Sequence, residues 1–162
     1  MREVEFKKAD LVNDLKLCIQ FRKDSFLASF GSADEWVKQS GEKGEKYIDW
    51  LRQYAKQNPD GVIHLWKNNK IIGQIECKVE SSFPGKAYIN LFYLIPEVRG
   101  TGVSKLMHEY VIDLFIRKGC HTARLSVSES NKPALAFYKK YGWAYVKPRE
   151  EDQTVHLYQL TF

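Results

Sequence analysis

A glycine-containing segment at residues 96–104 has the residue types of an anion-binding loop. It reads Pro-Glu-Val-Arg-Gly-Thr-Gly-Val-Ser and lies between an apolar run and the most regular amphipathic stretch of the chain. Glycine lets backbone N–H groups converge on one ligand, because no Cβ holds a phosphate away from the amides. The start of a helix would add the positive end of its dipole, and Arg99 could add a forked, charge-assisted contact. The segment therefore predicts a phosphate site, although a simple tight turn between a strand and a helix has the same local pattern.

Two common nucleotide-binding motifs do not fit this loop. A Walker A loop needs four residues between its first glycine and Gly-Lys-Ser/Thr, and a dinucleotide fingerprint needs a third glycine where Lys105 stands. A second segment, residues 131–143, reads Asn-Lys-Pro-Ala-Leu-Ala-Phe-Tyr-Lys-Lys-Tyr-Gly-Trp. Considered alone, its apolar residues would be the packing face of a helix.

Together, in this order and about thirty residues apart, the two segments resemble the cofactor signatures of the GNAT family of N-acetyltransferases. The first is similar to the family's Arg-Gly-x-Gly loop, and the second to its Asn, Ala, Phe-Tyr and Gly-aromatic positions. The resemblance covers Tyr88 to Trp143 well and the rest of the chain mainly in the order of its elements. Ser104 departs from the family pattern, which often has Gly or Ala there, but serine is small enough to fit.

The resemblance implies a site for acetyl-CoA between the strand that ends at Ile95 and the strand at residues 123–127. Tyr138 would lie near the sulfur and protonate the departing thiolate, a role that suits a phenol with a pKa of about 10. A backbone N–H near Leu94 would stabilise the oxyanion. The other cofactor-binding groups that the resemblance implies are the backbones of Tyr93 and Leu94 for the pantetheine arm, Asn131 beside it, and the amides of Arg99, Gly100, Thr101, Gly102, Val103 and Ser104 for the pyrophosphate.

The group that takes a proton from the acceptor amine is left open by the sequence. No acidic residue lies at residues 87–95, where some relatives carry one. Glu76 and Glu80 on the neighbouring predicted strand are candidates, but its alternating pattern favours an exposed polar face for both. Asn90 and Tyr88 could instead position a water molecule.

The acceptor pocket is expected between the loop that joins the first two helices, the strand faces beside Leu94, and the last strands. Phe26, Phe30, Trp36 and Tyr88 could give it aromatic walls, although ordinary core packing is the simpler role for most of them. The acceptor itself stays open among polyamines, aminoglycosides, amino acids, ribosomal N-termini and lysine side chains.

These groups need a sheet with helices on both faces to position them. Periodicity predicts helices at residues 10–28, 103–118 and 134–141, and a further helical stretch from a capping box at Ser32 and Glu35 to residue 57, interrupted at residues 40–44. Strands are predicted at residues 4–7, 62–66, 71–80, 87–95, 123–127, 143–147 and 154–162, with a hairpin turn at residues 67–70. The order βααβββαβαββ contains a βαβ unit. The predicted fold is therefore α/β (α+β): one GNAT-like domain over residues 1–162, with a central, twisted, mixed sheet of about seven strands.

The composition is ordinary for a globular domain of 162 residues, with 44% hydrophobic and 28% charged residues. No apolar run approaches the ~18 residues of a membrane span, and the charged N-terminus lacks the apolar core of a secretory signal. Cys18, Cys77 and Cys120 are expected to be buried or half-buried free thiols in a reducing cytoplasm. The four histidines have no metal-ligand spacing, so no metal site is predicted.

The net charge of +5 comes from 25 Lys+Arg and 20 Asp+Glu, but the positive excess is local. Residues 98–149 carry 10 basic and 3 acidic side chains, a balance of +7. Both cofactor signatures fall in this stretch, so we interpret the excess as a field around a phosphate-bearing cofactor. A nucleic-acid-binding role is disfavoured, because no RRM, helix-turn-helix or zinc motif is present.

The sequence therefore predicts an N-acetyltransferase that uses acetyl-CoA and acts on a primary amine of a small molecule or peptide by direct attack in a ternary complex. No cysteine lies in either signature, which argues against a route through an acyl-cysteine. The alternative is a non-catalytic acyl-CoA sensor on the same fold. The expected partners are the amine acceptor and, as in many relatives, a second copy of the chain, with no nucleic acid and no membrane.

Overall fold

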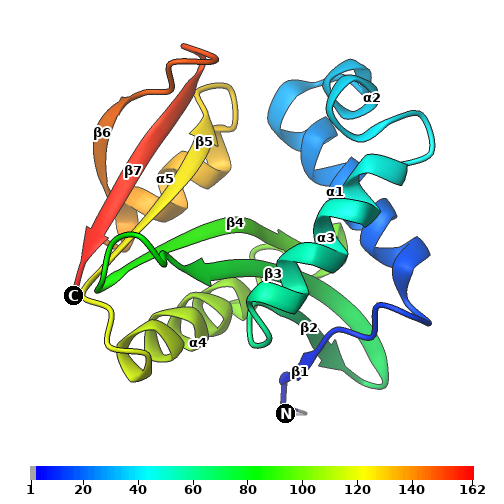
Figure 1. Cartoon of the computed structure of the whole chain (residues 1–162), viewed down its shortest axis with the longest axis horizontal. Coiled ribbons are helices and arrows are strands. Elements are labelled where there is room, and N and C mark those ends of the chain that lie inside the picture. Colours follow the sequence, from blue (N-terminus) through cyan, green and yellow to red (C-terminus); the bar gives the residue numbers. More distant parts are fainter. Residues whose placement is uncertain (1–2) are drawn as a thin grey trace.

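The computed structural model describes residues 3–162, which form one seven-stranded sheet with helices packed against it (Figure 1). The strands are β1 (Glu5–Lys8), β2 (Val62–Lys67), β3 (Lys70–Val79), β4 (Lys86–Leu94), β5 (Thr122–Ser128), β6 (Ala144–Pro148) and β7 (Val155–Thr161). The helices are α1 (Leu15–Phe30), α2 (Asp34–Ser40), α3 (Glu45–Gln57), α4 (Val103–Arg117) and α5 (Lys132–Lys140), with a short 3-10 helix, η1 (Pro96–Val98). The predicted α/β fold with a mixed sheet is confirmed.

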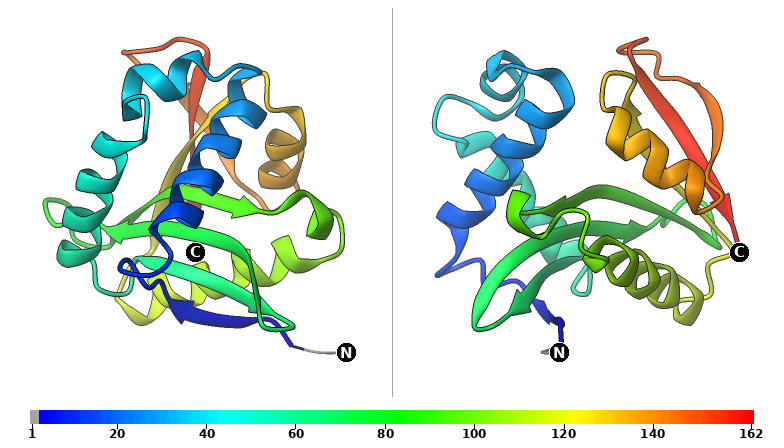
Figure 2. Two further views of the ribbon diagram at one scale, coloured as in Figure 1. Left: turned by 90° about the vertical axis from the view of Figure 1, so that its right-hand side faces the viewer. Right: turned by 180° about the vertical axis from the view of Figure 1, so that it is seen from behind.

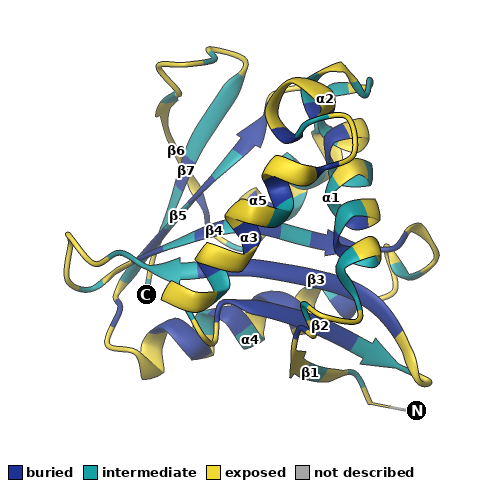
Figure 3. Ribbon diagram, turned by 45° about the vertical axis from the view of Figure 1, so that its right-hand side comes forward, coloured by how far each residue is buried: buried dark blue, intermediate teal, exposed yellow. Residues whose placement is uncertain are grey.

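The strand order in the sheet is β1-β2-β3-β4-β5-β7-β6, in which β4 and β5 run parallel and the other described neighbours run antiparallel. Helices α1 and α3 lie on one face of the sheet and α4 on the other (Figures 1 and 2). The main core includes fully buried residues of the sheet and of α4, such as Ile75 and Val111. A second buried cluster around Trp36 joins α1, α2 and α3, so the β2 and β3 backbones are covered on both sides (Figure 3).

The parallel strands β4 and β5 separate in the middle of the sheet. Their pairing runs from Lys86 opposite Thr122 to Ile89 opposite Leu125, and beyond it β4 has no partner on that side among the residues that the structure describes. Figure 1 shows the two strands diverging beyond this point, with α5 beside the departing β5. Because a strand must pair its backbone groups or leave them for another partner, this splay exposes a strand edge inside the sheet.

Two local signals in the sequence predicted the backbone correctly. Asn68 and Asn69 form the turn of the β2–β3 hairpin with φ angles of 53° and 60°, a left-handed conformation that asparagine tolerates. Asn131 caps α5, because its side chain accepts a hydrogen bond from the Ala134 N–H at 3.3 Å.

The first helix begins later than the periodicity predicts. The Asp10 carboxylate accepts hydrogen bonds from the N–H groups of Val12 and Asn13 at 2.9 and 3.0 Å. This local turn satisfies the backbone in a non-helical way. The regular helix therefore starts at Leu15 rather than at Asp10.

The interrupted second helical stretch is two separate helices, α2 and α3. The predicted capping box is not formed, because Glu35 accepts a hydrogen bond from Gln39 instead of reaching back to the start of the helix. The Ser32 hydroxyl does accept one from the Asp34 N–H at 3.3 Å. This bond spans two residues and not the three of a capping box, and the helix begins one residue later than the box requires.

The cysteines are buried and unpaired, as predicted. Burial raises the pKa of Cys18 and of Cys77 to about 12, so neither is a thiolate near neutral pH. Within residues 3–162, none of the helices has the length and apolar character needed to cross a bilayer. The same residues contain no group of three or more His, Cys, Asp or Glu that could hold a metal ion.

Candidate functional site

The loop between β4 and α4 presents a row of unused backbone donors. The backbone amides of residues 100–105 donate to no acceptor among the described residues. The helical hydrogen-bond pattern begins at the next residue, where the Leu106 N–H donates to the Gly102 carbonyl. Gly100 and Gly102 have φ angles of 75° and 93°, a left-handed conformation that favours glycine. A Cβ built at either position meets nothing within 4 Å. The loop is therefore an open row of N–H groups at a helix N-terminus, which fits a phosphate.

Arg99 is engaged with the protein and not directed at the amides of the loop. Its Nε donates to the Leu94 carbonyl at 2.9 Å, and its Nη2 lies 3.1 Å from the Asp24 carboxylate of α1. The Tyr93 hydroxyl donates to the same carboxylate at 2.6 Å. Burial and the Asp24 charge raise the pKa of Tyr93. These contacts tie the end of β4 to α1, a role for Arg99 that the motif did not predict.

The backbone of Leu94 faces the splay between β4 and β5. The Ile95 N–H donates to the Ile72 carbonyl of the β3 side at 2.9 Å, so the preceding residue points its N–H and C=O the other way. The backbone carbonyl of Tyr93 points toward β3, since a Cβ built at Gly73 of β3 would lie 2.5 Å from the Tyr93 oxygen. Alternation therefore turns the backbone groups of Phe92 and Leu94 toward the open edge, whereas the sequence had predicted Tyr93 and Leu94. Of these groups, the Leu94 carbonyl is already taken by Arg99 Nε, and the Leu94 N–H is left for a ligand.

The far side of the splay is closed by contacts between α1 and the start of α5. The Ser130 hydroxyl donates to the Ser29 carbonyl at 2.6 Å, and the Asn131 amide nitrogen lies 3.5 Å from the Ser29 hydroxyl. Asn131 therefore caps α5 with its oxygen and reaches α1 with its nitrogen. These bonds fix the position of α5 relative to the open edge of β4.

Tyr138 lies on α5 with its ring packed between β4 and the end of the helix. The ring centroid is 6.4 Å from that of Phe92, nearly parallel, and 5.7 Å from that of Trp143, edge to face. Only 9% of the residue is exposed. Burial is the cause of its raised pKa, and no hydrogen bond contributes. The phenol is therefore protonated at neutral pH, and its O–H makes no hydrogen bond within residues 3–162, which is the state that a proton donor needs.

His108 of α4 supports the tryptophan that contacts Tyr138. The indole Nε1–H of Trp143 donates to His108 Nε2 at 3.0 Å, and the imidazole is packed against Phe137 and Tyr141. Burial lowers the pKa of His108 from its usual 6.5. An imidazole that accepts this bond is neutral, so protonation would break it.

We expect this histidine to make the protein less stable in mild acid. Since its folded pKa lies below 6.5, the unfolded chain binds a proton that the folded protein excludes, and the free energy of unfolding should fall as the pH drops below 6.5. His108→Gln keeps an acceptor for Trp143 without titrating. Urea unfolding at about pH 7 and about pH 5 should show a smaller loss for the variant than for the wild type. An equal loss of unfolding free energy in both proteins would contradict this role. The loss would then be explained by His64, which both proteins contain and whose pKa is also lowered by burial.

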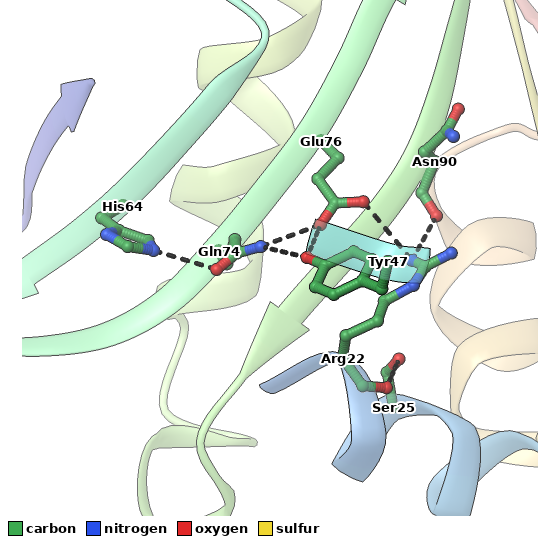
Figure 4. A network of polar contacts seen from close by, with 7 residues as sticks. All are labelled: Arg22, Ser25, Tyr47, His64, Gln74, Glu76 and Asn90. Atoms are coloured by element: carbon green, nitrogen blue, oxygen red, sulfur yellow. Dashed lines mark hydrogen bonds and ion pairs between the residues drawn. The ribbon is translucent and has the colours of Figure 1, made fainter. Parts of the chain in front are cut away.

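Glu76 is buried, contrary to the exposed polar face that its strand pattern favours. Its residue is 0% exposed, and its Oε2 accepts hydrogen bonds from the Tyr47 hydroxyl at 2.5 Å and from Gln74 Nε2 at 2.8 Å (Figure 4). Its Oε1 lies 3.6 Å from Nη1 of Arg22 and makes no hydrogen bond within the described residues. Gln74 in turn accepts a hydrogen bond from His64 Nε2 at 2.9 Å. The alternation was correct, but α1 and α3 cover this face and supply polar partners for it.

The Tyr47 hydroxyl should stabilise the fold through this network. Burial, together with the charge of Glu76, raises the pKa of the Tyr47 hydroxyl well above 10, so it stays a donor. Tyr47→Phe removes one of two donors from a buried carboxylate oxygen, and we expect it to cost about 1–3 kcal/mol of unfolding free energy. Tyr54→Phe on the same helix is the matched control, because the Tyr54 hydroxyl is buried without a hydrogen-bond partner among the described residues. Urea unfolding should leave that variant as stable as the wild type or more stable, and equal losses in both would contradict the network.

The other sequence candidates lie outside the splay. Glu80 is half-buried, pairs with Lys78 at 3.7 Å, and bonds through its N–H to Lys86 at the opposite end of β4 from Leu94. Phe26 and Trp36 belong to the second buried cluster, with 8% and 1% of their surfaces exposed. They are core residues and not pocket walls.

Tyr88 remains at the edge of the site. Its hydroxyl is 2.7 Å from that of Ser126, one residue beyond the last β4–β5 pair. It therefore places a polar group where the two strands begin to separate.

The site thus consists of the splayed parallel strands β4 and β5 and a glycine-containing loop at the N-terminus of α4. A family model described as "Acetyltransferase (GNAT) family" matches residues 22–143, and the chain belongs to this family. Acetyl-CoA is the standard cosubstrate of the family. The recognition of the family from the two signatures is thereby confirmed.

Individual relatives share only a limited part of their sequence with this chain. N-alpha-acetyltransferase 30 of Schizosaccharomyces pombe is 25% identical over 112 residues, which are 68% of this chain and 73% of that protein. Thialysine N-epsilon-acetyltransferase of Mus musculus is 32% identical over 65 residues, 40% of this chain and 38% of that protein. The structure of PaiA N-acetyltransferase from Thermoplasma acidophilum in complex with coenzyme A has a TM-score of 0.78 at 20% identity and covers 99% of both chains. The solved structure has the same fold as this chain, and the two sequence relatives differ in the amine that their names give.

Proposed function

We propose that this protein transfers the acetyl group of acetyl-CoA to a primary amine of a peptide or small molecule. The observation that carries the proposal is the row of unpaired amides at residues 100–105, which lies at the end of a β4 edge that is open from Asn90 onward. In a GNAT-family chain, such a row has an evident ligand in the pyrophosphate of the cosubstrate.

The residues present fit the cosubstrate well. The amides of residues 100–104 would hold its phosphates, and the free backbone groups of Phe92 would pair with the amide-containing arm in the manner of an added strand. Asn131 would border that arm from α5. When bound, acetyl-CoA supplies an acetyl group that is activated as a thioester. The positive balance of residues 98–149 favours this polyanionic ligand.

Two groups of the chain would act on the reacting atoms. The Leu94 N–H points into the splay and would stabilise negative charge on a carbonyl oxygen placed there. Tyr138 would give its proton to the departing thiolate, since its hydroxyl is protonated and uncommitted. The buried cysteines have raised pKa values and no contact with this loop, which supports direct transfer without an acyl-enzyme.

The proton of the acceptor ammonium would leave through water and not to a carboxylate that touches the amine. A general base must reach its proton directly or through one water molecule. Glu80 lies seven residues along β3 from Gly73, the partner of Leu94, which is about 23 Å. Glu76 is nearer, but both of its oxygens are enclosed. The Tyr88 and Ser126 hydroxyls at the start of the splay are the polar groups that we propose to hold the water.

The acceptor class follows from the relatives and is part of the proposal. Their names specify an N-alpha amine in one case and the N-epsilon amine of thialysine in the other. Both are unhindered primary amines, so we propose this class for the present chain. The buried free thiols are compatible with a reducing compartment, and we propose that the protein works in the cytoplasm, alone or as a homodimer.

A screen tests this function. Purified protein is incubated with acetyl-CoA and a panel of peptides with free N-termini, lysine-like amines and polyamines, and free thiol is detected. Release of thiol that depends on one class of amine supports the proposal. Saturable binding of acetyl-CoA with no thiol release across the panel would instead favour the non-catalytic acyl-CoA sensor.

A further inference from the structure

Strand β4 carries one extra residue at the point where it leaves β5. Cys77 of β3 is opposite Ile89, and Glu76 is opposite Leu91, so Asn90 is a bulge. Ile89 is also the last residue of β4 that pairs with β5. A bulge bends its strand and interrupts the ladder, so this residue coincides with the start of the splay.

Arg22 of α1 holds the backbone of this bulge. Its Nη1 donates to the Asn90 carbonyl at 3.1 Å (Figure 4). The guanidinium is flanked by the rings of Phe26 and Tyr47, with its central carbon 5.5 and 5.9 Å from their centroids. Its side chain is only 20% exposed, so the contact is largely shielded from water.

Glu76 fixes Arg22 from the other side. Its Oε1 lies 3.6 Å from Arg22 Nη1, and its Oε2 is already bonded to Tyr47 and Gln74. Within residues 3–162, Arg22 is the cation that pairs with this fully buried carboxylate. A buried charge needs such a partner, so Arg22 and Glu76 constrain each other. Groups from α1, α3, β3 and β4 therefore meet at the bulge.

We propose that Arg22 is a positioning residue that holds the Asn90 carbonyl of the bulge and thereby keeps β4 apart from β5, with Glu76 acting through Arg22. The open edge at Phe92 and Leu94 depends on this separation. The inference rests on the proposed function, because it makes Arg22 and Glu76 determinants of acetyl-CoA binding. It gives Glu76 a different task from proton abstraction.

The test compares Arg22→Met, Arg22→Lys, Glu76→Gln and the double variant Arg22→Met/Glu76→Gln with two controls. Arg117→Met and Asp113→Asn break an exposed arginine–carboxylate pair of 3.0 Å on α4 and match the chemistry of the changes. Folding of each variant is checked by circular dichroism. The readouts are the Kd of CoA by calorimetry, kcat and KM for acetyl-CoA, and amide hydrogen exchange of residues 91–94 without ligand.

We expect Arg22→Met and Glu76→Gln each to raise the Kd and KM about tenfold with a much smaller change in kcat. Their effects should not add in the double variant, since each removes the same contact. Arg22→Lys should recover part of the affinity, because the charge beside Glu76 returns. Exchange at Phe92 and Leu94 should be slower in Arg22→Met than in Arg117→Met, because their unpaired N–H groups can pair with β5 once the two strands are no longer held apart.

Two results would overturn the inference. One is unchanged exchange at residues 91–94 and unchanged CoA affinity in Arg22→Met. The other is a Glu76→Gln variant that binds CoA normally but loses kcat and the acidic limb of its pH–rate profile, which is the behaviour of a general base. If the wild type binds no CoA, the proposed function fails by itself, and the exchange measurement still decides whether Arg22 holds the bulge.

Discussion

Replacing Tyr138 by phenylalanine is expected to lower kcat about 100-fold, because a positioned acid contributes roughly 10²–10⁴ to proton transfer. The ring should keep its place, since it packs against Phe92 and Trp143 through its faces and edges and not through the hydroxyl. The Kd of CoA should therefore stay within about twofold of the wild-type value. Steady-state kinetics and calorimetry on the same preparations measure the two quantities.

Tyr141→Phe is the matched control for this change. Tyr141 lies one turn further along the chain, next to His108 and Phe137, at a ring distance of 4.9 Å from the imidazole. It should retain the wild-type kcat. A Tyr138→Phe variant with full activity would show that the thiolate leaves without a proton from this phenol, and the assignment of the general acid would be wrong.

Gly102→Asp is expected to weaken CoA binding roughly 100-fold, since a like charge placed against a ligand phosphate costs several kcal/mol. Gly102 has a φ of 93° and immediately precedes α4, with open space where a side chain would extend. Aspartate tolerates the left-handed region better than most residues and is favourable near a helix N-terminus. The free energy of unfolding should therefore change little while the affinity falls.

Gly119→Asp provides the comparison at the other end of the same helix. Its φ is 79°, and a Cβ there also meets nothing within 4 Å, so the backbone strain and the space are alike. It lies far along the chain from the loop, and CoA affinity should be unchanged. Equal loss of affinity in both variants would point to a general effect of the added charge, and unchanged affinity in Gly102→Asp would remove the phosphate from this loop.

Much of the fold could be predicted from local patterns in the sequence. The apolar spacing of α4 and the paired asparagines of the β2–β3 turn report on local geometry, and the structure agrees at both. The late start of α1 shows the limit of such patterns. Its first turn is lost because one side chain, Asp10, offers the backbone a competing set of hydrogen bonds.

The site was predictable where it depends on backbone and not where it depends on packing. The glycine loop and the Asn131 cap follow from residue type, whereas the direction in which Arg99 points is set by Asp24, which is distant in the sequence. The role of Arg22 could not be predicted from the sequence, because an arginine on a helix ordinarily points into solvent. Its role becomes visible only when the bulge at Asn90 and the buried Glu76 are brought to it by the fold.

Transfer of a labelled acetyl group tests most directly whether the protein moves acetyl from acetyl-CoA to an amine. Wild-type protein and Gly102→Asp are incubated with acetyl-CoA labelled with ¹³C in the acetyl group and with the amine that gives the fastest thiol release, and the products are analysed by mass spectrometry. We expect the label in an amide of the acceptor in proportion to the thiol released, and far less labelled amide from Gly102→Asp at subsaturating acetyl-CoA. Label recovered only as acetate, or no thiol released with any primary amine while CoA still binds, would contradict the proposed function.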